Sequence, residues 1–297
     1  MSRVAGERLT SREHVREFFC RDLTPLAIYD RLSEGSSYRF LFESVTGGDQ
    51  VSRYSFVGAS PAAVYRLFRD RLEVEAADGR RLVIRERPLA ALAEELARIR
   101  SPRPTLPFAG GFVGYFGYDL ARLSEPLGPP PADDPYALPL AELGRYDTVV
   151  VFDHARQRLA AVSNEIDGLV SPETARRRLD ELTVSLLEVR EIRGAAEVPG
   201  DSDPSVPEMD AVVSADDYSA AVESLKEHIR AGDILQAVLA RRWTVEADLE
   251  PAALYRAVRL INPSPYMVLL DSPAVALIGA SPEMLVRKQG ARLETRP

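Results

Sequence analysis

Residues 262–297, NPSPYMVLLDSPAVALIGASPEMLVRKQGARLETRP, decide the fold of this chain. Short apolar runs at 266–270, 275–278 and 284–286 alternate with Pro, Asp and Gly, which is typical of strands separated by turns. The last five residues, 293–297, predict a further strand that no capped helix or polar tail follows. We therefore expect an antiparallel sheet here, with the chain cut within that sheet.

The region before residue 194 carries the same strand pattern. A turn at Asp78 and Gly79 predicts a hairpin, and apolar residues at one-face spacing predict helices over 89–99 and 172–189. The expected strands are residues 38–43, 53–57, 62–68, 72–75, 81–85, 148–152 and 159–163.

A polar segment rich in Pro and Gly, residues 194–210, predicts a linker between regions 1–193 and 211–297. After it, Ser214 and Gly232 are the start and stop signals of a helix. Residues 234–240 predict an apolar strand. On such a strand Gln236 shares a face with its apolar neighbours two positions away, so its amide needs a partner or a ligand.

Composition excludes several classes of protein. A net charge of −8 argues against a nucleic-acid partner, because no basic field is present to displace counterions. The single cysteine, Cys20, forms no intrachain disulfide, and no Cys/His cluster has the spacing of metal ligands. No stretch has the length and character of a signal peptide or a membrane span, so we expect a cytoplasmic protein without a membrane partner.

Two motifs carry a family resemblance. Gly-Ala-Ser-Pro-Glu stands at 279–283 and Glu-Thr-Arg-Pro at 294–297. With these motifs the chain resembles the chorismate-utilising enzymes, and within them the large subunits (component I) of anthranilate synthase. The resemblance implies an α+β fold with antiparallel sheets packed as a sandwich and helices around them. It also implies that 1–193 is the N-terminal region of component I and that 211–297 begins the chorismate-binding domain.

A second pair of motifs implies a regulatory site. Leu-Phe-Glu-Ser at 41–44 and Asn-Pro-Ser-Pro-Tyr-Met at 262–267 are similar to the two segments that form the tryptophan pocket in this family, with Phe42 in place of a second Leu. The resemblance implies that tryptophan is a feedback inhibitor of the protein. It implies a binding site formed by Glu43, Ser44, Asn262, Pro265, Tyr266 and Met267.

Gln236 stands where relatives that add water to chorismate have a lysine as general base. A glutamine amide cannot accept a proton at neutral pH, so its presence favours ammonia over water as the nucleophile. We therefore expect Gln236 in the wall of the active site, and the resemblance implies a substrate contact at Thr295.

The implied reaction converts chorismate and ammonia to anthranilate and pyruvate in tryptophan biosynthesis. The family uses Mg²⁺ and receives ammonia from a glutamine amidotransferase subunit (component II). Its metal ligands and main catalytic residues fall beyond Pro297, so we expect no metal site within these residues and no turnover by them alone.

Two alternatives remain open. One is aminodeoxychorismate synthase component I of folate synthesis, whose discriminating motif would begin at Pro297. The other is a non-catalytic tryptophan-binding fragment. The motifs at 41–44 and 262–267 favour anthranilate synthase.

Overall fold

The computed structural model describes residues 8–20, 23–32, 35–45, 53–101, 104–130, 134–188 and 209–295. Spatial contacts divide the chain into two compact units, Met1–Arg193 together with Pro251–Pro297, and Gly194–Glu250. The C-terminal strands thus belong in space with the N-terminal region, whereas the sequence grouped them with 211–250. Most of the expected linker, residues 194–208, lies outside the described residues.

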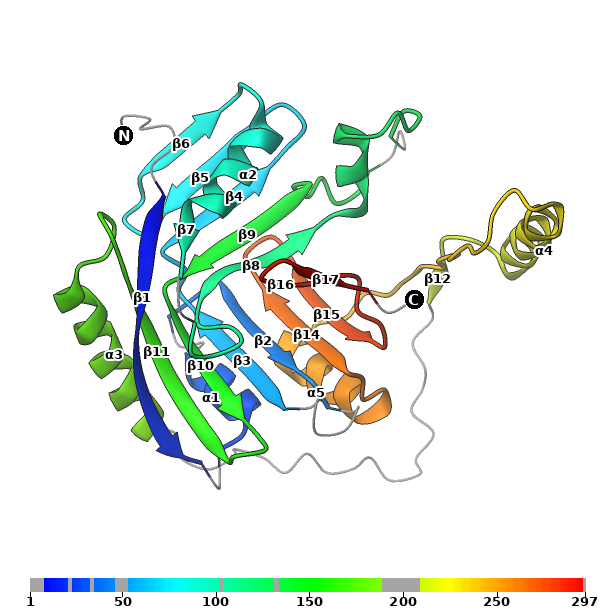
Figure 1. Ribbon diagram of the computed structural model, residues 1–297. Coiled ribbons are helices and arrows are strands. Elements are labelled where there is room, and N and C mark those ends of the chain that lie inside the picture. Colours follow the sequence, from blue (N-terminus) through cyan, green and yellow to red (C-terminus); the bar gives the residue numbers. More distant parts are fainter. Residues whose placement is uncertain are drawn as a thin grey trace. The chain divides into compact units, whose positions relative to one another are not determined.

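An eight-stranded sheet forms the centre of the larger unit (Figure 1). Its neighbouring strands run antiparallel, except for the parallel pair of β1 and β7. The strands expected at 266–270 and 275–278 are confirmed as β14 and β15, at one edge of this sheet. In spatial order the strands are β15 (Ala276–Ser281), β14 (Tyr266–Asp271), β2 (Arg39–Glu43), β3 (Tyr54–Ala59), β10 (Thr148–Asp153), β11 (Arg158–Ile166), β1 (Leu9–Phe19) and β7 (Ile99–Arg100).

Three helices cover one face of this sheet: α1 (Pro25–Leu32), α3 (Pro172–Leu187) and α5 (Pro251–Ile261) (Figure 1). Apolar side chains from all three join those of β2, β3, β10, β11 and β14 in one buried cluster. The α3 helix begins as its sequence predicts, because Ser171 caps it by accepting a hydrogen bond from the Thr174 backbone at 3.2 Å. The main hydrophobic core of the larger unit therefore lies between this face of the sheet and the three helices.

A five-stranded antiparallel sheet forms the second layer, and α2 (Pro88–Arg98) packs against it. Phe40 of the larger sheet packs with Val113 and Tyr146 of this one, so a shared apolar cluster joins the two sheets. In spatial order its strands are β6 (Arg81–Ile84), β5 (Leu72–Ala76), β4 (Ala63–Leu67), β9 (Ala141–Tyr146) and β8 (Gly111–Phe116).

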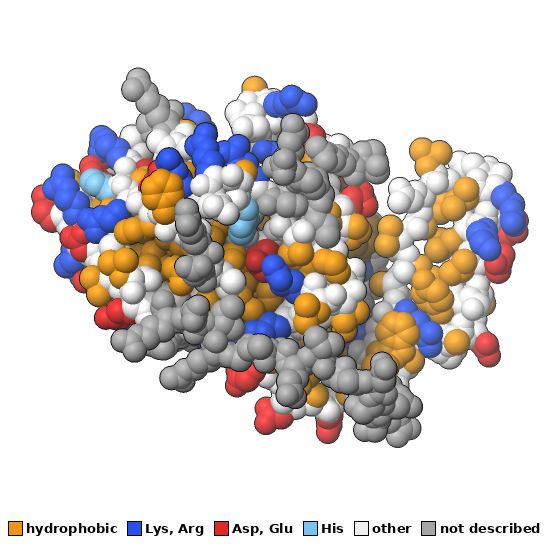
Figure 2. Space-filling view, turned by 90° about the horizontal axis from the view of Figure 1, so that it is seen from below, with side chains coloured by type: hydrophobic (Ala, Val, Ile, Leu, Met, Phe, Trp, Pro, Cys, Tyr) orange, Lys and Arg blue, Asp and Glu red, His pale blue; other side chains and the backbone are white. Residues whose placement is uncertain are grey.

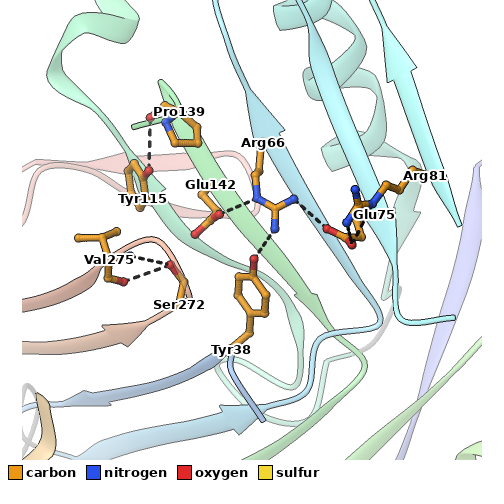
Figure 3. Close-up of polar contacts among 9 residues, drawn as sticks. All are labelled: Tyr38, Arg66, Glu75, Arg81, Tyr115, Pro139, Glu142, Ser272 and Val275. Atoms are coloured by element: carbon orange, nitrogen blue, oxygen red, sulfur yellow. Dashed lines mark hydrogen bonds and ion pairs between the residues drawn. The ribbon is translucent and has the colours of Figure 1, made fainter. Parts of the chain in front are cut away.

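A polar network lies where the two sheets meet (Figure 3). Arg66 of β4 donates to Glu142 at 2.9 Å and to Glu75 at 3.0 Å, and it also bonds the Tyr38 hydroxyl. Glu142 is buried, so Arg66 neutralises a carboxylate that would otherwise be costly to hold there.

The larger unit confirms the α+β class and the packed antiparallel sheets. The sequence did not predict β1 or α1. The charged side chains of β1 hide its strand pattern, because ion pairs such as Arg12 with Glu165 at 2.8 Å offset their charge. In the C-terminal segment, residues 284–286 precede a strand instead of forming one; a short hairpin of β16 (Arg287–Gln289) and β17 (Arg292–Glu294) follows them.

The smaller unit contains α4 (Ala215–Ala231) and a two-stranded ribbon of β12 (Asp210–Ala211) with β13 (Trp243–Thr244). The helix signals are confirmed: Ser214 accepts from the Asp217 backbone at 3.0 Å, and Gly232 ends the helix in a left-handed conformation. Hydrophobic side chains are exposed on this unit (Figure 2).

The strand predicted at 234–240 is wrong. These residues have no regular structure, and Leu235 is 97% exposed and Val238 88% exposed. A strand requires a neighbouring strand to hydrogen-bond its backbone, and none of the described segments pairs with this one. Across the described ranges, no helix has the length and apolarity needed to cross a membrane.

Candidate functional site

The two motifs at 41–44 and 262–267 meet side by side in the larger sheet. Strands β2 and β14 run antiparallel, with Glu43 opposite Met267 and Phe42 opposite Val268. Just beyond the paired strands, the Val45 backbone N–H donates to the Ser264 carbonyl at 3.2 Å. The second motif is thereby held against the first, although more than two hundred residues separate them in sequence.

A cavity of about 470 Å³ opens at this junction, on the face of the sheet opposite α5. Its walls are mainly aromatic and apolar, with few polar groups, as is typical of small-molecule sites. The lining residues are Phe42, Glu43, Ser44, Tyr54, Phe56, Pro107, Pro265, Tyr266, Met267, Val268, Met284 and Arg287.

Aromatic side chains of β2 and β3 form the floor of the cavity. Tyr54 and Phe56 alternate along β3, so their rings lie on the same face, with centroids 6.3 Å apart and stacked planes. Phe42 projects from the same face of β2. A flat aromatic ligand would find a matching surface here.

Ser44 contributes a buried, unpaired hydroxyl to this cavity. Its hydroxyl oxygen is buried and has no hydrogen-bond partner among the described residues. Leaving a buried hydroxyl unpaired costs about 1–3 kcal/mol, and a ligand atom in the cavity would remove that cost. Ser44 is therefore placed to contact a bound molecule.

Glu43 has a different position from its neighbour. Its carboxylate accepts hydrogen bonds from the Tyr255 hydroxyl at 2.7 Å and from the Arg259 guanidinium at 3.1 Å, both on α5. Successive side chains on a strand point to opposite faces, so Phe42 and Ser44 face the cavity while the Glu43 carboxylate faces the helix. Burial, together with the adjacent Glu43 charge, raises the pKa of Tyr255 far above its ordinary range. The tyrosine remains a hydrogen-bond donor, and Glu43 fixes β2 to α5.

Of the second motif, Pro265, Tyr266 and Met267 line the cavity, whereas Asn262 does not. Asn262 is exposed where α5 ends; its backbone N–H donates to Val258 at 2.8 Å, and its carbonyl accepts from the Ser264 hydroxyl at 3.3 Å. Asn262 shapes the turn between α5 and β14.

The remaining candidate residues lie elsewhere. Gln236 is exposed in an irregular segment of the smaller unit, so it shares no strand face with Ile234 and Val238. Thr295 is exposed after β17. Within the described ranges, no group of three or more His, Cys, Asp or Glu side chains is placed to hold a metal ion. The Mg²⁺ requirement therefore stays a prediction.

Comparison with known proteins identifies the family. The family model described as chorismate binding enzyme matches residues 37–297. The chain belongs to the chorismate binding enzyme family. This confirms the resemblance first indicated by the motifs at 279–283 and 294–297.

Similar curated proteins include anthranilate synthase components. The chain is 39% identical to anthranilate synthase component 1 of Thermus thermophilus, over 95% of this chain and 58% of that protein. It is 37% identical to the probable anthranilate synthase component 1 of Schizosaccharomyces pombe, over 93% of this chain and 54% of that protein. The chain thus spans little more than half the length of these relatives.

A solved structure agrees with the sequence relatives. The crystal structure of anthranilate synthase component I from Streptococcus pneumoniae has a TM-score of 0.65 to this chain at 28% identity. The match covers 81% of this chain and 53% of the other. It supports the α+β fold.

The motifs did not reveal every residue of this site. Tyr255 and Arg259 are four residues apart on a predicted helix, so the sequence indicates that they share a face of that helix. It does not indicate that both contact Glu43. Met284 and Arg287 follow the motif at 279–283, and no local pattern marks them as cavity residues.

Proposed function

We propose that this chain is the tryptophan-regulated portion of an anthranilate synthase component 1. The observation that supports the proposal is the meeting of the two motifs, 41–44 and 262–267, on one cavity that contains an unpartnered buried hydroxyl, that of Ser44. Tryptophan needs a flat apolar surface for its indole and hydrogen-bond partners for its amino-acid group. The aromatic floor offers the first and Ser44 the second.

The reaction of the protein, on this proposal, converts chorismate and ammonia to anthranilate and pyruvate. Ammonia comes from a glutamine amidotransferase subunit, and Mg²⁺ assists the reaction. The relatives named above support this assignment. Gln236 also supports it, because an amide at that position cannot act as the base that water addition requires. The substrate roles of Gln236 and Thr295 are part of this proposal.

Tryptophan binding is tested by isothermal titration of the complete protein carrying Ser44→Ala. The variant loses one hydrogen bond to the ligand, about 1 kcal/mol, so the dissociation constant should rise about fivefold. Ser219→Ala is the matched control, because this exposed serine lies on α4 and bonds only its own helix, at Ala215. Unchanged tryptophan affinity in Ser44→Ala would refute the assignment of this cavity.

The product is tested separately. The complete protein, given chorismate, Mg²⁺ and an ammonium salt, should generate anthranilate, which is followed by its fluorescence. Formation of aminodeoxychorismate or isochorismate instead would place the protein in another branch of the family.

A further inference from the structure

In the part of the chain that the structure describes, the cavity lining includes one basic residue and no carboxylate that is free to face a ligand. Among the described residues of the lining, Arg287 is the only Lys or Arg, and Glu43, the only acid, bonds Tyr255 and Arg259 of α5. Among the described lining residues, the Arg287 guanidinium is therefore the one charged group left for a ligand, together with the hydroxyls of Ser44, Tyr54 and Tyr266. This combination favours an anionic group on the ligand.

Arg287 is also available to bind such a group. It begins β16, its side chain is exposed, and none of the described residues forms an ion pair or side-chain hydrogen bond with it. Glu294 stands opposite it in the β16–β17 register, yet the two side chains form no ion pair. Arg39 of the large sheet, by contrast, is paired with Asp271 at 2.7 Å.

We propose that Arg287 binds the carboxylate of the aromatic amino acid held in this cavity and thereby selects ligands that carry a carboxylate. This inference rests on the proposed function. The indole lies against Phe42, Tyr54 and Phe56, the amino group reaches Ser44, and the carboxylate pairs with the planar guanidinium. Glu43 then acts as a positioning residue that holds β2 against α5, and the ligand does not touch its carboxylate.

Three ligands separate the contributions of the two charged groups: tryptophan, indole-3-propionate, which lacks the ammonium, and tryptamine, which lacks the carboxylate. Their dissociation constants are measured by titration calorimetry on the complete protein and on Arg287→Gln. A charge-assisted hydrogen bond to a carboxylate predicts about 10- to 100-fold weaker binding of tryptophan and of indole-3-propionate to the variant. Tryptamine, which has no carboxylate to lose, should bind both proteins equally.

Two further variants complete the design. Lys288→Gln removes the same charge from the next residue of β16, which points to the other face and does not line the cavity, so all three affinities should be retained. Arg287→Lys keeps the charge without the planar fork, so it should restore part of the lost affinity.

The outcomes are distinct. If the original protein binds none of the three ligands, the proposed function fails and this inference fails with it. If tryptophan binds but Arg287→Gln weakens tryptophan and tryptamine equally, or weakens neither, the proposed function stands and the role of Arg287 is refuted. Selective loss of the two carboxylate ligands supports the inference.

Discussion

The hydrogen bond between Tyr255 and Glu43 should be a major stabiliser of the α5–β2 contact. In Tyr255→Phe the ring remains in place and only the hydroxyl is lost. Tyr255 is 0% exposed, and its hydroxyl donates at 2.7 Å to a carboxylate whose side chain is 4% exposed. A hydrogen bond to a charged group contributes about 1.5–3 kcal/mol, and Arg259 alone would then serve this oxygen. We expect the free energy of unfolding to fall by that amount.

Urea denaturation followed by circular dichroism measures this loss through the transition midpoint at an unchanged slope. Tyr118→Phe is the matched control, because Tyr118 is 94% exposed, and its stability should stay within about 0.5 kcal/mol of the original. Ser44→Ala gives the complementary result: it removes an unpaired buried hydroxyl on the other face of β2, so stability should be unchanged or slightly higher. If Tyr255→Phe also stays within about 0.5 kcal/mol, Glu43 does not fix β2 to α5 as described.

Three further changes test other parts of the larger unit. Arg66→Met leaves the buried Glu142 carboxylate without its cation, so urea denaturation should show a loss of about 3–5 kcal/mol in the free energy of unfolding. The control Arg80→Met breaks an exposed pair with Asp78 and should cost less than about 1 kcal/mol. Burial lowers the pKa of His154 below its ordinary value of 6.5, so protonation favours the unfolded chain. The free energy of unfolding should therefore fall as the pH drops from about 7 to 5. His154→Gln should flatten this pH dependence, whereas the control His228→Gln, at an exposed residue of α4, should leave it unchanged. Gly114→Ala would place a Cβ 1.9 Å from a backbone oxygen of β9, so we expect a loss above about 3 kcal/mol or failure to fold.

Each of these has a contrary outcome. Equal effects of the two arginine variants would show that the network in Figure 3 contributes no more than a surface ion pair. A pH profile that His154→Gln leaves intact would assign the dependence to another group. Original stability in Gly114→Ala would mean that β8 and β9 are farther apart than described.

The sequence alone determined the parts of this protein that depend on local pattern. Apolar alternation and turn residues located β14 and β15, and the Ser214 and Gly232 signals located α4, because these choices are made within a few residues of chain. The segment 234–240 shows the limit of this reasoning: its composition suits a strand, but no described strand pairs with it. Motifs likewise indicated which residues belong to one site.

Only the tertiary structure decided what each residue does there. Glu43 and Ser44 are adjacent in sequence, yet strand alternation sends one carboxylate to α5 and one hydroxyl to the cavity. Tyr255, which bonds Glu43, is 212 residues away from it in sequence. Arg287 reaches the cavity only because β14 and β15 lie beside β2. Such contacts depend on strand order and register, which arise from packing across the whole unit and leave no signal in the local sequence.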